Sequence, residues 1–117
     1  MAKYLIAISG DEQRWDSMTA DEWAAIDEGH RRFRARAGAA ILADGQLVGR
    51  PEWTTVHADG NGRPAPTDGP FVESKEMLGG FYVIDVPEKA DAVELASLLA
   101  EASVDHSAVE VIPLVVH

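Results

Sequence analysis

The chain contains no cysteine, which excludes disulfide bonds, a thiolate zinc site and a cysteine nucleophile. This composition suits the reducing cytoplasm, where we expect the protein to reside. Basic residues are also few, because 10 Lys and Arg stand against 20 Asp and Glu and give a net charge of −10. Non-specific binding to nucleic acids or anionic membranes needs excess positive charge, so we expect neither as a direct partner.

Long hydrophobic runs are missing as well. The apolar stretch at residues 4–8 is too short for a membrane span or a signal-peptide core, and its length is typical of a first strand. No internal repeat, low-complexity tract or linker interrupts the 117 residues, and 46% of them are hydrophobic. We therefore expect one globular domain over residues 1–117.

Hydrophobic periodicity predicts the order β-α-β-β-loop-β-α-β. The expected strands are 3–8, 39–48 with a bend at Asp44-Gly45, 53–58, 81–86 and 108–116, where Pro113 indicates an edge position or a bulge. Residues 59–66 are expected to form a loop, and Gly79-Gly80 a hinge before the fourth strand. The first helix is expected to begin at a Thr19–Glu22 capping box and to stop at Gly38, and the second to cover 87–100. The spacing of the first helix predicts a buried stripe of Trp23, Ile26, His30, Phe33 and Ala37. Two helices cannot cover both faces of such a sheet. We therefore expect an α+β, ferredoxin-like βαββαβ fold with helices on one face of an antiparallel sheet, and a partner on the other, equally apolar face.

The segment 67–86 carries a set of motifs in a recognisable order. These are Asp68-Gly69-Pro70-Phe71, Glu73-Ser74-Lys75-Glu76, Leu78-Gly79-Gly80-Phe81-Tyr82 and Asp85-Val86. This order resembles the DGPF group of the YciI-like (YCII-related) family, most of whose members have no assigned reaction. The resemblance implies a homodimer that forms a dimeric α+β barrel, with two sheets packed face to face.

His30 is the strongest candidate for chemistry, because an imidazole exchanges protons near neutral pH. The resemblance implies that His30, on the first long helix, pairs with Asp11, just after the first strand. In that arrangement Asp11 would fix the imidazole tautomer while the other nitrogen moves a proton. The alternative is a histidine at the core edge that bonds to backbone, with Asp11 only ending the strand.

Three further residues are candidates for substrate binding. His57 and Trp53 share one face of a predicted strand, so His57 would either join His30 in a cavity or lie at a wet strand end. Asp68 is named by the motif, although an Asx-turn explains an Asp-Gly-Pro sequence without any ligand. Trp15, Trp23 and Trp53 would either line a pocket for a planar ligand or belong to the core. No His-x-His or Glu-x-x-His pattern points to a metal site, and no cofactor is expected.

The resemblance, together with the candidate residues, implies two alternative functions. The first is a small cofactor-independent enzyme that uses His30 and Asp11 for isomerase- or lyase-like chemistry on a small organic molecule, such as a cyclic or aromatic acid. The second is a non-catalytic, dimeric ligand-binding or regulatory protein, because bacterial DGPF proteins are often encoded beside sigma-factor-like regulators. A His30–Asp11 hydrogen bond beside an open cavity favours the enzyme. A His30 that is sealed or turned away from Asp11 favours the binding protein, with contacts through residues 59–71.

Overall fold

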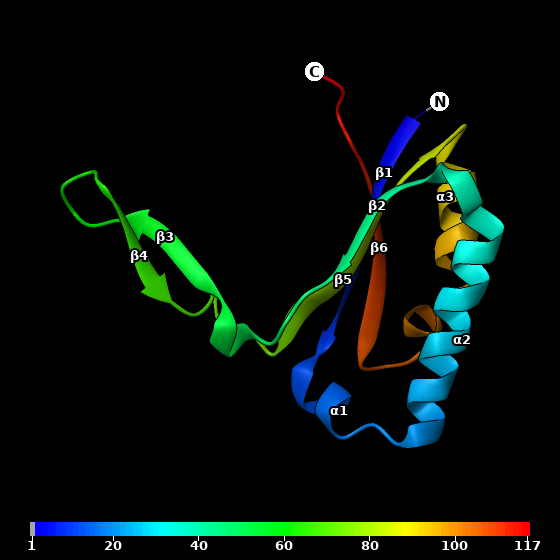
Figure 1. Ribbon diagram of the computed structural model, residues 1–117, viewed down its shortest axis with the longest axis horizontal. Coiled ribbons are helices and arrows are strands. Elements are labelled where there is room, and N and C mark those ends of the chain that lie inside the picture. Colours follow the sequence, from blue (N-terminus) through cyan, green and yellow to red (C-terminus); the bar gives the residue numbers. More distant parts are fainter. Residues whose placement is uncertain (1) are drawn as a thin grey trace.

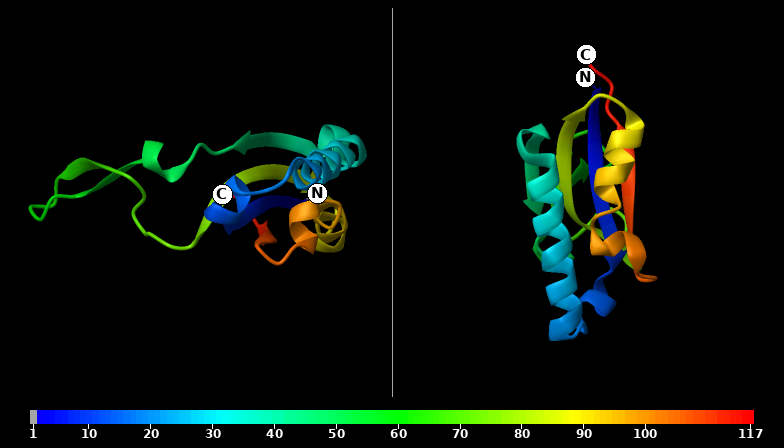
Figure 2. Two further views of the ribbon diagram at one scale, coloured as in Figure 1. Left: turned by 90° about the horizontal axis from the view of Figure 1, so that it is seen from below. Right: turned by 90° about the vertical axis from the view of Figure 1, so that its right-hand side faces the viewer.

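The computed structural model describes residues 2–117. Its strands are β1 (Ala2–Asp11), β2 (Ile41–Gln46), β3 (Thr54–Ala58), β4 (Pro64–Asp68), β5 (Glu76–Val86) and β6 (Ser107–Pro113). Its α-helices are α1 (Glu12–Asp16), α2 (Ala20–Ala37) and α3 (Lys89–Ala96), joined by the 3-10 helices η1 (Gly38–Ala40), η2 (Arg50–Glu52) and η3 (Ala100–Ser103). Figure 2 shows α2 and α3 side by side on one face of the main sheet.

The main sheet is antiparallel, with the strand order β2-β5-β1-β6. This order, together with the two long helices, is consistent with the predicted ferredoxin-like α+β unit. Strand β6 lies at the edge of the sheet, which explains why it tolerates Pro113, a residue that cannot donate a ladder hydrogen bond.

Helix α2 begins as its sequence predicts. The Thr19 hydroxyl accepts a hydrogen bond from the Glu22 backbone N–H at 3.2 Å, and the Glu22 carboxylate accepts one from the Thr19 N–H at 3.1 Å. The helix ends at Gly38, whose φ of 52° is unfavourable for a residue with a side chain. The capping box and the Gly38 stop are therefore confirmed.

Alternate residues of the two central strands build the core between the sheet and the helices. The buried set comprises Tyr4, Ile6 and Ile8 of β1, Tyr82, Ile84 and Val86 of β5, Phe33 of α2, and Ala92, Leu95, Ala96 and Leu99 around α3. The opposite face carries Leu5, Ala7, Phe81, Val83 and Ile112, and among residues 2–117 no helix covers it. The sheet is thus apolar on both faces and covered on one.

Residues 50–75 form an extension that we call the arm. Strands β3 and β4 pair only with each other, in a separate two-stranded sheet that projects away from the helices (Figure 1). The radius of gyration is 16.2 Å, whereas about 13 Å is expected for a compact chain of this length. The sequence analysis placed the third strand in the main sheet and residues 59–66 in a loop. It missed β4 because Pro64 and Pro66 argue against a strand, but a two-stranded ribbon leaves one side of each strand free.

Other boundaries also differ from prediction. The irregularity of β2 lies between Ile41 and Ala43 and not at Asp44-Gly45. Strand β5 begins at Glu76, so Gly79-Gly80 lies inside a strand and is not a hinge; Gly79 is the extra residue of a bulge opposite Ile8 and Ser9. The predicted second helix, 87–100, is α3 followed by η3, with its capping box at Glu88 and Asp91.

Candidate active site

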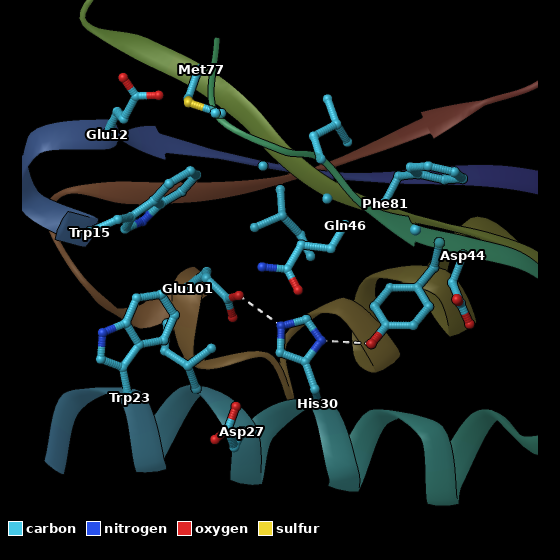
Figure 3. A pocket seen from close by; sticks show the side chains of 18 of the residues that line it. Glu12, Trp15, Trp23, Asp27, His30, Asp44, Gln46, Met77, Phe81 and Glu101 are labelled. Atoms are coloured by element: carbon cyan, nitrogen blue, oxygen red, sulfur yellow. Dashed lines mark hydrogen bonds and ion pairs between the residues drawn. The ribbon is translucent and has the colours of Figure 1, made fainter. Parts of the chain in front are cut away.

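Three side chains from three elements form one hydrogen-bonded chain. Nδ1 of His30 lies 2.6 Å from the Tyr82 hydroxyl, and Nε2 lies 2.7 Å from Oε2 of Glu101 (Figure 3). An ionised carboxylate only accepts, so Glu101 holds the proton on Nε2 and leaves Nδ1 to accept from the Tyr82 O–H. The arrangement fixes both the tautomer and the plane of the imidazole ring.

Gly29 explains how Glu101 reaches His30. A Cβ atom at Gly29 would lie 2.8 Å from the Ala100 backbone nitrogen and 3.0 Å from the Leu98 carbonyl oxygen. Because glycine has no such atom, the backbone before η3 packs directly on α2, one residue from His30. The next residue of η3, Glu101, is thereby held against the imidazole ring.

A cavity of about 660 Å³ opens beside these three hydrogen-bonded side chains, between α2 and the sheet. Its volume lies in the range of small-molecule sites. Figure 3 shows Trp15, Trp23 and Gln46 around the space next to His30. His30 is partly exposed to it, with 19% of its side-chain surface accessible.

Trp15 forms a fixed wall of this cavity. Its indole N–H donates to the Ser107 hydroxyl at 2.9 Å. A Cβ at Gly79 or at Gly10 would lie 2.6 Å from the ring, so both glycines are needed for the ring to lie flat against the strands. The Gly79 of the sequence motif therefore makes room for a wall of the cavity.

The phenol of Tyr82 is kept protonated by its surroundings. Burial raises the pKa of Tyr82 above its ordinary value, and the carboxylates of Asp44 and Glu101 act in the same direction. The Arg34 guanidinium, 5.8 Å from the centre of the Tyr82 ring, opposes this shift. At neutral pH the hydroxyl is therefore a proton donor, and Tyr82 lies on the cavity wall.

The predicted hydrogen bond between His30 and Asp11 is wrong. Asp11 caps α1, and its carboxylate accepts from the backbone N–H groups of Gln13 and Arg14 at 3.0 and 3.4 Å. It also lies 3.6 Å from the Lys75 ammonium group. Strand β1 extends to Asp11 itself, which carries this side chain past the cavity to the start of α1, and Glu101 takes the position next to His30.

Trp53, His57 and Asp68 all belong to the arm and are not among the residues that line the cavity of their own chain. The Trp53 indole donates to the Val48 carbonyl at 2.8 Å, and the His57 ring packs edge-on against Phe71 at 4.8 Å. Asp68 ends β4 opposite Thr54. Of the two alternatives for His57, a place beside His30 in the same chain is wrong, because β3 is not a strand of the main sheet, and the structure has the exposed strand position. A role of these residues in binding substrate stays a prediction.

Neither Glu101 nor Tyr82 was predicted from the sequence. Strand alternation places Tyr82 on the face of Ile84, toward the helices, so a contact with an inward-facing His30 was predictable in principle. Glu101 gave no such signal, since nothing local distinguishes it from the exposed Glu94. Among residues 2–117, no group of three or more His, Asp or Glu residues is arranged to hold a metal ion. Within the same residues, no helix is long and apolar enough to cross a membrane.

The fold and the cavity are those of a small α+β protein in which a ligand-sized space lies between an antiparallel sheet and one long helix. The sequence profile of the YCII-related domain matches residues 2–115, and the chain belongs to the YCII-related family. Over 50 residues the chain is 42% identical to an uncharacterized protein of Rhizobium meliloti (strain 1021). That alignment covers 43% of this chain and 40% of the relative, so the chain matches about two fifths of the relative's length.

Proposed function

We propose that the protein is a small acid-base enzyme that needs no cofactor and acts on a small organic molecule in the cavity beside His30. The observation that carries this proposal is the continuous chain Glu101–His30–Tyr82, with contacts of 2.7 and 2.6 Å, on the wall of an open cavity. The reaction class is isomerase- or lyase-like, in which a proton leaves one atom of the substrate and returns to another atom or to a leaving group.

The proposal assigns a part to each residue. The Tyr82 oxygen takes a proton from the ligand while its own proton passes to Nδ1 of neutral His30, so no free phenolate is formed. Glu101 stabilises the imidazolium that forms and keeps its ring in place, so it is a positioning residue. In the reverse direction the imidazolium returns its proton to the Tyr82 oxygen, which protonates the product.

Deuterium incorporation tests this proposal without knowledge of the substrate. A panel of small enolisable carbonyl compounds, with anionic, neutral and amine-bearing members, is incubated with the protein in D₂O and analysed by mass spectrometry. The wild-type chain is expected to label at least one compound. Tyr82→Phe and His30→Gln are expected to slow labelling by about 10²- to 10⁴-fold, the usual contribution of a general acid or base.

Two controls separate chemistry from folding. His117→Gln changes an exposed histidine that is not among the residues lining the cavity, and it is expected to leave labelling unchanged. Glu101→Gln keeps the shape of the side chain but removes its charge, so it is expected to change the pH profile of labelling. Labelling that survives in both Tyr82→Phe and His30→Gln would contradict the assignment of this site.

A second candidate function is a dimeric protein that binds a ligand without transforming it, as a regulator. One observation favours it: both nitrogens of His30 already have partners, and His30 is turned away from Asp11. In that case the wild-type chain would bind members of the panel and label none of them. Calorimetry on the same compounds distinguishes this outcome from a failure to bind.

The assembly belongs to the same proposal. The uncovered face of the sheet is apolar through Leu5, Phe81 and Val83, and a homodimer in which two such faces pack as a dimeric α+β barrel would bury it. Light scattering at micromolar concentration is expected to give twice the chain mass. Val83→Asp, which places a charge on this face, is expected to give the mass of one chain. A wild-type monomer would remove the dimer from the proposal.

A further inference from the structure

The cavity beside His30 has a strong excess of negative charge. Its acidic lining residues are Glu12, Asp16, Asp27, Asp44 and Glu101, and the basic side chain among its lining residues is Arg34. Glu12 lies 3.7 Å from Arg50 and is partly compensated. Among residues 2–117, no ion pair joins Asp16, Asp27 or Asp44 to a basic group. An anionic ligand would therefore meet repulsion from several sides.

Glu101 adds an observation that is independent of this charge count. The residue is only 5% exposed, and its Oε2 bonds to His30, but its Oε1 has no hydrogen-bond partner among the described residues. A buried carboxylate oxygen without a donor costs free energy. Because Glu101 lies on the cavity wall, a donor or positive charge in the cavity would offset that cost.

The apolar part of the cavity suits the same kind of ligand. Trp23 keeps 42% of its surface exposed, although the helical periodicity placed it in the core. It lines the cavity together with Trp15, whose ring is held by Ser107 (Figure 3). Tryptophan faces attract cations more strongly than other aromatic rings, and two of them beside carboxylates are typical of sites for organic ammonium groups.

We infer that this cavity binds a small organic cation, an amine that is protonated at neutral pH and carries a compact apolar body. The inference rests on the proposed function for the location of the site, and it replaces the expected cyclic or aromatic acid. The ammonium group lies among Glu101, Asp27 and the two tryptophans. The apolar body extends toward Ile8 of β1 and Ile26 of α2, which line the same cavity.

A series of probes with one ring and different charges tests this inference. Benzylamine, benzyl alcohol and benzoate are matched in size, and calorimetry or tryptophan fluorescence measures their dissociation constants. Benzylamine is expected to bind at least about tenfold more tightly than benzyl alcohol, and benzoate more weakly than either. The preference is expected to shrink as salt is added, because salt screens charges near the surface. Benzyltrimethylammonium, which has no N–H, separates the attraction of the tryptophans from donation to the carboxylates.

Matched variants locate the charge. Asp27→Asn is expected to weaken benzylamine about fivefold and to leave benzyl alcohol unchanged. Asp21→Asn is the control, because Asp21 is exposed on the same helix and is not part of the cavity wall. Glu101→Gln is expected to lower the preference for the amine as well. If Glu101→Gln does not fold, the comparison of Asp27→Asn with Asp21→Asn still shows whether a carboxylate of the cavity wall attracts the amine.

The outcomes separate this inference from the proposed function. Equal binding of the three benzyl probes, tighter binding of benzoate, or no binding of any probe would overturn the inference. Deuterium labelling confined to anionic or neutral compounds would also overturn it and would leave the acid-base enzyme standing. Selective benzylamine binding that Asp27→Asn weakens, without labelling of any compound, would support the inference and contradict the enzyme.

Discussion

The helix-covered body, which is the part of the described chain outside residues 50–75, buries Phe33, whereas the arm leaves Phe71 exposed. Phe33 of α2 is fully buried against Tyr82, with ring centres 4.2 Å apart, whereas Phe71 of the arm is 69% exposed. In the body, side chains pack across a sheet and two helices. In the arm, strand pairing and local hydrogen bonds maintain the shape, such as the one from the Thr55 hydroxyl to the Gly69 carbonyl. Only the body has a core of its own.

This difference also divides the candidate site residues. His30 lies in the body and meets Tyr82 and Glu101 at the cavity, while Trp53, His57 and Asp68 lie in the arm. The arm is joined to the body at its base, where Arg50 lies 3.7 Å from Glu12 and Lys75 lies 3.6 Å from Asp11. A site that used residues of both regions would need an arm from a second chain.

The largest effect is expected from truncating one phenylalanine in each region. Phe33→Ala removes a buried ring and is expected to lower the free energy of unfolding by about 3–5 kcal/mol. Phe71→Ala removes an exposed ring and is expected to change it by less than about 0.5 kcal/mol. Urea unfolding at a fixed protein concentration measures both. A large loss in Phe71→Ala would mean that the arm is packed in solution, and light scattering would then show whether a second chain covers it.

A smaller effect is expected from adding one methyl group to the body at Gly29. The new Cβ would overlap the backbone of Ala100, so Gly29→Ala is expected to cost about 1–3 kcal/mol despite the better helix propensity of alanine. It is also expected to separate Glu101 from His30, which the imidazole NMR signals would report. Gly49→Ala is the control, because its Cβ would make only an ordinary contact of 3.6 Å with Pro51. Unchanged His30 signals in Gly29→Ala would contradict the role given to this close approach.

Ligand binding distinguishes the histidines of the two regions. His30→Ala is expected to weaken benzylamine binding severalfold, because it removes a residue of the cavity wall and the partner of Glu101. His57→Ala is expected to leave binding unchanged in a single chain, since His57 lies on the arm. The same calorimetric titration measures both variants. A loss of binding in His57→Ala would show that an arm contributes to the cavity in the assembled protein.

The smallest effect concerns the pH dependence of stability. Because the pKa of Tyr82 is raised in the folded chain above its ordinary value of 10.0, folding favours the protonated phenol. The resulting stabilisation is fully present below pH 10.0 and is lost as the pH rises through the folded pKa. The free energy of unfolding of the wild-type chain is therefore expected to fall more steeply in this range than that of Tyr82→Phe. If the free energies of unfolding of the wild-type chain and of Tyr82→Phe fall in parallel with pH, the raised pKa of Tyr82 is contradicted.

Local patterns predicted much of the body. The Thr19–Glu22 capping box, the Gly38 stop and the edge position implied by Pro113 each depend on a few neighbouring residues, and the structure has all three. The helical spacing also placed His30 on the inner face of α2 correctly. The arm was harder to predict, because prolines and glycines argue against strands and nothing local indicates that two strands leave the main sheet.

The sequence by itself determined most strands and helices of the body, the acidic character, the α+β class and the histidine around which a site could form, because these depend on composition, periodicity and local capping. The tertiary structure decided which carboxylate meets that histidine. Asp11 is nearer to His30 along the chain than Glu101, which is 71 residues away. The absence of a side chain at Gly29 lets η3 pack on α2 and brings Glu101 to the imidazole ring, while Asp11 caps its own short helix. Packing between distant segments, which no local pattern encodes, therefore determines which carboxylate contacts His30.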